Sequence, residues 1–276
     1  MALSPALALG AGQLARTSLI GHDRADAVAD TRREHAGPPS LRIGLLGSFA
    51  VNGQAGALLP AQSQLILALA VNPGGLSNRQ LRRLLGADAG HPKPADSLRQ
   101  LIARTRRAVG RAPGSREWIE HLGHGHYALH PDAWVDWRVF ETLTAAGIER
   151  GQAPQLADAL SLVRGQPFTG CYYWWLEPEL VEAVTRRVVT AAEALATLRL
   201  ADRDPAAAVR AARIGLAADS SAEQLWRIVM RAEHFAGNLA GVRGAWGRCM
   251  SVASDVAADG QPDSATLAVY SELLSK

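Results

Sequence analysis

The chain has 276 residues, of which 48% are hydrophobic and 20% are charged, so its composition excludes a chain that is disordered throughout and its length allows two domains with hydrophobic cores. Its formal net charge of +3 is unevenly distributed, because residues 41–135 carry eleven Lys and Arg against five Asp and Glu, whereas residues 136–276 carry fourteen against seventeen. A basic segment joined to a mildly acidic one predicts a domain that binds a polyanion and a domain that faces a protein partner.

Two cysteines, Cys171 and Cys249, are too few and too far apart for a disulfide framework. We therefore expect a reduced chain in the cytoplasm. The sequence has no apolar run of the about eighteen residues that a membrane span requires. Residues 1–40 show no sustained hydrophobic period, so we expect a mobile tail or the remnant of something upstream. No positive charge precedes their apolar start, so we expect no secretory signal.

Residues 41–133 have the pattern of a small α+β domain. The segment 41–53, LRIGLLGSFAVNG, predicts one strand closed by an Asn-Gly turn. Proline and glycine signals predict a helix that begins near Pro60 and ends at 73–74, and Ser77 predicts the cap of a second helix that stops at Gly86. A third helix and a hairpin with strands around 118–119 and 127–129 follow. This order predicts a winged helix-turn-helix with an added N-terminal sheet.

The third helix, residues 95–110, separates apolar from charged side chains. At roughly 100° per residue, one face holds Leu98, Leu101, Ile102, Thr105, Ala108 and Val109, and the rest holds Gln100, Arg99, Arg104, Arg106, Arg107 and Arg111. Only Asp96 is an acidic neighbour, although each close pair of like charges costs a helix roughly 0.2–0.5 kcal/mol. The pattern therefore favours a helix that binds double-stranded DNA over one whose charged face is only solvated.

Mid-helix positions are the ones that reach base edges when such a helix lies in the major groove. Gln100, Ala103, Arg104 and Arg107 point most directly outward, and Arg106 flanks them. Arginine can donate two hydrogen bonds to guanine, and glutamine can pair in the same way with adenine. We expect the side chains at these positions to reach base edges.

The remaining basic residues are expected to contact the DNA backbone. Arg99 and Arg111 at the ends of the helix would bind phosphates, which fix register without reading sequence. We interpret the hairpin GHGHY as the wing, with Arg116 and His126 near phosphate or the minor groove, and with Tyr127 packed inward.

From Asp136 to residue 275 every predicted element is helical. One long helix begins at Pro178, and two shorter ones begin near Pro205 and Leu239. The spacing between these two starts is about 34 residues, the period of a tetratricopeptide repeat. The residues that would stack on the neighbouring helix are Leu225, Val229, Ala232 and Ala236. We expect a helical repeat domain over 136–275, with an unrelated helical bundle as the alternative.

Other motifs point to packing rather than to chemistry. The residues His121, His124, His126 and His130 lie close in sequence, but interleaved glycines and the lack of a nearby cysteine favour a turn over a metal site. The aromatic cluster at 171–179, CYYWWLEPE, is interpreted as a core contact, with a ligand pocket or partner surface as alternatives. No catalytic or phosphate-binding motif is present, so we expect no enzyme activity, no metal and no cofactor.

Taken together, the segments LRIGLLGSFAVNG, SNRQLRRLLG, SLRQLIARTRR, GHGHYAL, VDWRVF and ALSLVRGQPF resemble the Streptomyces antibiotic regulatory protein (SARP) family. The resemblance covers residues 41–274. It implies an OmpR-type winged helix over 41–133, followed by a bacterial transcriptional activator domain that is tetratricopeptide-like (TPR-like). It implies promoter binding as a homodimer, recruitment of RNA polymerase, contact positions at Arg99, Gln100, Arg104, Arg106 and Arg107, and a wing marked by Gly125 and Tyr127.

The sequence departs from this family at three places. Thr105 stands where the family usually has leucine, Leu85 stands where a tryptophan is common, and the start of the first helix, PAQSQ, lacks a basic residue. The C-terminal half also resembles part of larger actinobacterial membrane-associated proteins with LysM modules. The alternative function is therefore a signalling or scaffold module that does not bind DNA and acts through its helical domain.

Overall fold

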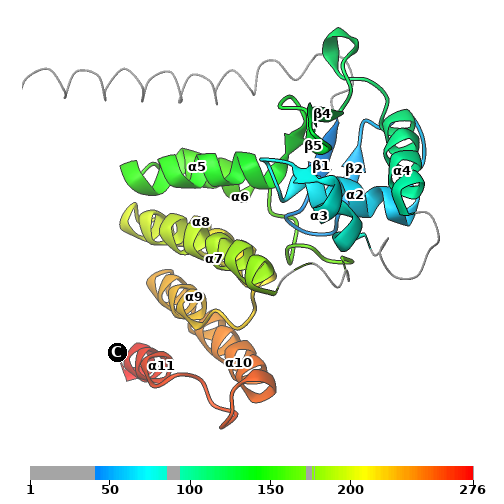
Figure 1. Cartoon of the computed structure of the whole chain (residues 1–276). Coiled ribbons are helices and arrows are strands. Elements are labelled where there is room, and N and C mark those ends of the chain that lie inside the picture. Colours follow the sequence, from blue (N-terminus) through cyan, green and yellow to red (C-terminus); the bar gives the residue numbers. More distant parts are fainter. Residues whose placement is uncertain (1–40, 86–93, 172–175, 177, 276) are drawn as a thin grey trace, which may run out of the picture. The chain divides into compact units, whose positions relative to one another are not determined.

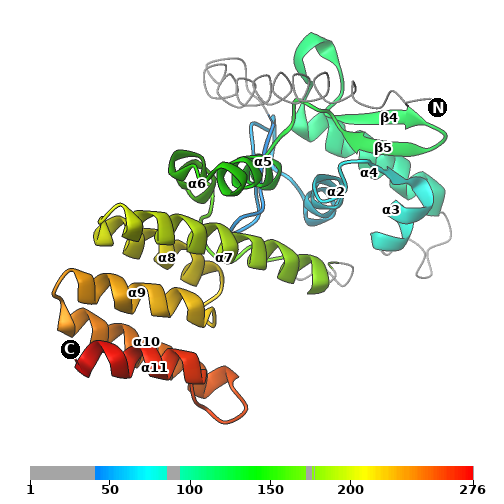
Figure 2. The same cartoon turned by 90° about the vertical axis from the view of Figure 1, so that its left-hand side faces the viewer.

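The structure is a computed structural model that describes residues 41–85, 94–171, 176 and 178–275, and residues 40–276 form one compact unit. Figures 1 and 2 show sheets and helices up to α4 and the hairpin, followed by a series of helices from α5 onward. The predicted N-terminal tail, the loop at 86–93 and the aromatic residues 172–175 lie outside the described residues.

The first sheet joins the two ends of the winged-helix segment. Strand β1 (Arg42–Gly44) pairs antiparallel with β2 (Ala50–Asn52) and parallel with β6 (Trp134–Val135), in the order β2-β1-β6. The prediction of one strand over 41–53 was wrong, because the chain reverses between β1 and β2. Leu45 and Leu46 donate their backbone N–H groups to the Asp136 carboxylate instead of to a neighbouring strand, and Gly47 adopts φ +141°.

The predicted order of helices and hairpin is confirmed. The elements are α2 (Pro60–Ala70), β3 (Leu76–Ser77), α3 (Asn78–Leu84), α4 (Pro94–Val109), η2 (Pro113–Ser115), β4 (Ile119–Gly123) and β5 (His126–Leu129). The second sheet has the order β3-β5-β4. Ser77 caps α3 as predicted, since its hydroxyl accepts from the Gln80 N–H, and the Gln80 side chain accepts from the Ser77 N–H at 2.9 Å.

Every described element after β6 is helical, as predicted. The helices are α5 (Asp136–Arg150), α6 (Ala153–Leu160), α7 (Pro178–Ala201), α8 (Pro205–Ala218), α9 (Glu223–Phe235), α10 (Leu239–Val256) and α11 (Ser264–Ser275). Neighbours in sequence pack together, and α9 also contacts α7 and α11. Leu225, Val229 and Ala232 are buried, but Ala236 is exposed because it caps the end of α9.

The predicted repeat period is visible in the hydrogen bonds of two turns. At the first turn, the Asp204 N–H donates to the Arg199 carbonyl at 2.8 Å, and the Asp204 side chain caps α8. At the second turn, the Asn238 N–H donates to the Glu233 carbonyl at 2.8 Å, and the Asn238 side chain caps α10. Each residue of the second turn follows its equivalent in the first by one repeat period, so the same turn closes two successive helical units.

Both cysteines are free and buried, and burial raises the pKa of Cys171 and of Cys249 to about 11. Because the thiolate is the reactive form, we expect iodoacetamide to label the folded protein near pH 8 at least about a hundredfold more slowly than the protein unfolded in guanidinium chloride. Mass spectrometry of each cysteine peptide over time measures both rates. Equal rates in the two states would contradict the buried positions.

Candidate nucleic-acid interface

Helix α4 has one buried and one exposed face, as its sequence predicts. Leu98, Ile102, Thr105 and Val109 are buried. The Thr105 hydroxyl donates to the Leu101 carbonyl at 2.8 Å, which satisfies it without a partner from another helix and allows threonine at a core position. The exposed residues are Arg99, Gln100, Ala103, Arg104 and Arg107.

The exposed face carries arginines without acidic partners in the described residues. Arg104 donates from Nε to the Gln100 carbonyl at 3.3 Å, so its side chain lies along the helix. Arg99 and Arg107 make no ion pair within the described part of the chain. These guanidinium groups are therefore available for an anion.

Arg106 has a different position from the other arginines of α4. Its Nε and Nη2 both donate to the Ile119 carbonyl, at 2.9 and 2.7 Å, and its guanidinium lies 5.9 Å from the centre of the Tyr127 ring. Glu117 adds a distant ion pair at 4.0 Å. Arg106 thus holds α4 against β4, at the base of the hairpin.

Arg111 and Arg116 lie beyond the end of α4. Arg111 donates to the Ser115 carbonyl at 2.8 Å and lies 3.7 Å from a Glu117 carboxylate oxygen, but two thirds of its side chain stays exposed. Arg116 is exposed and has no ion pair among the described residues. Both can approach a phosphate from the side of the hairpin.

The turn of the hairpin is fixed against the start of α3 (Figure 2). The Asn78 N–H donates to the Gly125 carbonyl at 2.7 Å, and a Cβ at Gly125 would lie 2.5 Å from the Asn78 side chain. His124 occupies the turn with φ +47°, and His126 begins β5, so the two do not share one strand. No cluster of three metal-ligating side chains occurs among the residues that the structure describes.

Helix α3 contributes basic residues that the sequence analysis did not assign. Arg79 and Arg83 are exposed and four residues apart, so they share one face of the helix. No acidic residue lies within α3. The signal is present in the run RQLRR, which carries three arginines within one turn and a half of helix.

None of the described helices combines the length and the apolar character needed to cross a membrane.

Comparisons with known proteins identify the fold. No family model matches the sequence, and no curated protein matches it either. The structure is similar to that of Mycobacterium tuberculosis EmbR in complex with a low-affinity phosphopeptide, with a TM-score of 0.66 and 21% sequence identity. The match covers 85% of this chain and 65% of the EmbR chain. The chain therefore has a SARP-like fold, in which a winged helix is followed by TPR-like helices.

Proposed function

We propose that this protein is a DNA-binding transcriptional regulator that places α4 in the major groove of promoter DNA and the β4–β5 hairpin on the adjacent backbone. The observation that carries the proposal is the exposed face of α4, where Arg99, Arg104 and Arg107 lack acidic partners among the described residues. A positively charged helix face beside a hairpin matches the charge and the groove width of B-form DNA.

Each basic residue then has a role set by its position. Gln100, Arg104 and Arg107 contact base edges from the middle of α4. Backbone phosphates are contacted by Arg79, Arg83, Arg99, Arg111, Arg116 and, from the hairpin, His126. Arg106 positions the hairpin, because its guanidinium is already bonded to Ile119.

The similarity to EmbR, a regulator of the SARP kind, supports this function at the level of the fold. In the proposal the protein activates transcription in the cytoplasm, and the TPR-like helices contact RNA polymerase or form a homodimer. Helical repeats offer extended surfaces for such protein partners.

Fluorescence anisotropy with the promoter fragment of the protein's own gene tests the proposal. The affinity of the parent should fall at least about tenfold between 50 and 200 mM salt, because phosphate contacts release counterions. Replacing both Arg104 and Arg107 with alanine should lower the affinity about a hundredfold, at about 1–3 kcal/mol for each base contact. Circular dichroism should show unchanged helix content.

The matched control replaces Arg210 and Arg213 with alanine, since both are exposed on α8. This variant loses the same charge outside the proposed interface and should bind DNA like the parent. Equal binding by the Arg104/Arg107 variant and the parent would overturn the assignment of α4.

The second candidate is a module that binds a protein partner and no DNA. It is favoured by the first turns of α2, where residues 60–64 include no basic side chain to contact a phosphate. A folded parent protein without salt-dependent DNA binding would favour this candidate over the regulator.

A further inference from the structure

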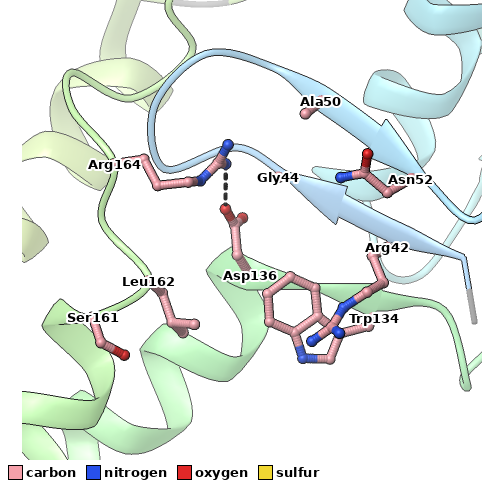
Figure 3. Close-up of a pocket in the computed structure, with 9 residues that line it drawn as sticks. All are labelled: Arg42, Gly44, Ala50, Asn52, Trp134, Asp136, Ser161, Leu162 and Arg164. Atoms are coloured by element: carbon pink, nitrogen blue, oxygen red, sulfur yellow. Dashed lines mark hydrogen bonds and ion pairs between the residues drawn. The ribbon is translucent and has the colours of Figure 1, made fainter. Parts of the chain in front are cut away.

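We propose that the outer face of the β2-β1-β6 sheet binds a small anion with a carboxylate or phosphate group. A cavity of about 240 Å³ lies on this face, between the sheet, the start of α5 and the end of α6 (Figure 3). Successive residues of β1 point to opposite faces of the sheet, so Ile43 points into the core whereas Arg42 and Gly44 face the cavity. This site is separate from α4 and does not depend on the proposed DNA binding.

One end of the cavity presents an available cation. The Arg42 guanidinium lies 4.5 Å from the centre of the Trp134 ring, which holds it in place by a cation–π contact. Among the described residues, Arg42 has no hydrogen bond or ion pair through its side chain. Asn52 is its partner in the sheet register and adds an exposed amide that can donate to the same anion.

The other end presents a second, partly neutralised cation. Arg164 pairs with Asp136 at 2.9 Å and donates to the Ser48 carbonyl at 3.3 Å, and 44% of its side chain is exposed. Gly44 makes room for it, since a Cβ there would collide with Arg164 Nη2. The three charged residues lining the cavity, Arg42, Arg164 and Asp136, sum to +1, so the cavity favours an anion.

Size and lining restrict the ligand further. Typical pockets for drug-sized ligands measure about 300–1,000 Å³, so 240 Å³ admits a small metabolite and excludes a dinucleotide. Ala50, Leu162 and the Trp134 ring offer apolar contacts for a short carbon skeleton. A bound anion would join β1 and β2 to the segment after α6, and so would stabilise the contact between the sheet and the helical part.

Thermal unfolding and tryptophan fluorescence with two probes, inorganic phosphate and succinate, test the site against sodium chloride of equal ionic strength. We expect a saturable rise in Tm and a saturable fluorescence change with at least one probe, because a ligand that binds only the folded state stabilises it. The probe that binds more tightly identifies phosphate or carboxylate as the preferred group. Arg42→Gln should weaken binding about tenfold, since it removes a charge-assisted hydrogen bond.

Three variants separate this site from other basic surfaces. Arg210→Gln removes an exposed charge from α8 and should bind like the parent, as should the Arg104/Arg107 double alanine variant. Trp134→Phe should lose the fluorescence change but keep the rise in Tm. The proposal is overturned if neither probe exceeds chloride, if Arg42→Gln responds like the parent, or if the response disappears with Arg104 and Arg107.

Discussion

Replacement of Asp136 with alanine is expected to lower the free energy of unfolding by about 3–5 kcal/mol, which corresponds to a Tm roughly 10 °C lower. The carboxylate is buried and accepts from the Leu45 N–H at 2.7 Å, the Leu46 N–H at 3.1 Å and the Arg164 guanidinium at 2.9 Å. Alanine would leave the two buried backbone N–H groups of Leu45 and Leu46 without an acceptor, and Arg164 would keep only its bond to the Ser48 carbonyl. Denaturant unfolding followed by circular dichroism measures the loss.

Burial raises the pKa of Asp136 above 3.8, although its three donors oppose this shift. The folded state therefore retains a proton at pH values where the unfolded state has lost it. The contribution of this group to the free energy of unfolding falls as the pH rises from 3.8 through the raised pKa. This slope should be absent from Asp136→Ala.

Glu182→Ala provides the control for Asp136, because Glu182 also pairs with an arginine but 70% of its side chain is exposed. We expect a change within about 0.5 kcal/mol, as for most exposed ion pairs. If both variants lost a similar free energy of unfolding, burial would not be the cause of the large loss at Asp136.

Replacement of Gly75 with alanine is expected to lower the free energy of unfolding by about 2–4 kcal/mol, the second large effect. Gly75 has φ +81°, and an added Cβ would lie 2.5 Å from the backbone carbonyl oxygen of Tyr127. The obstacle is the backbone of β5, which cannot move as a side chain can. The hairpin must shift, so the proposed binding to DNA should weaken together with stability.

The neighbouring Gly74 is a matched control for this substitution. Its backbone lacks a positive φ, and a Cβ added there meets no atom within 4 Å. Gly74→Ala should therefore change the free energy of unfolding by less than about 0.5 kcal/mol. Equal losses in the two alanine variants would contradict the close approach of Gly75 to β5.

Local signals in the sequence predicted the elements well. Pro60, Ser77, Pro178 and Pro205 mark helix starts through chemistry within one turn, and the structure places α2, α3, α7 and α8 at those residues. The repeat period between Pro205 and Leu239 was also readable, because identical turns need similar residues at equal spacing.

The features that the sequence did not predict depend on contacts between residues far apart in the chain. The reversal after β1 depends on Asp136, which lies far along the chain, and the position of Arg106 depends on the Ile119 carbonyl, which any residue could supply. A helical wheel places Arg106 near the exposed face but cannot place the hairpin. The cavity at Arg42 combines β1, β2, β6 and the segment after α6, and no sequence motif connects them.

The matching turns at Asp204 and Asn238 bear on how the helical half can change in length. Because both turns have the same geometry, a duplication of one repeat length would leave the following helix in its original orientation relative to its new neighbour. An insertion of another size would rotate every later helix away from its neighbour. Lineages of this protein should therefore gain or lose helices here in whole modules.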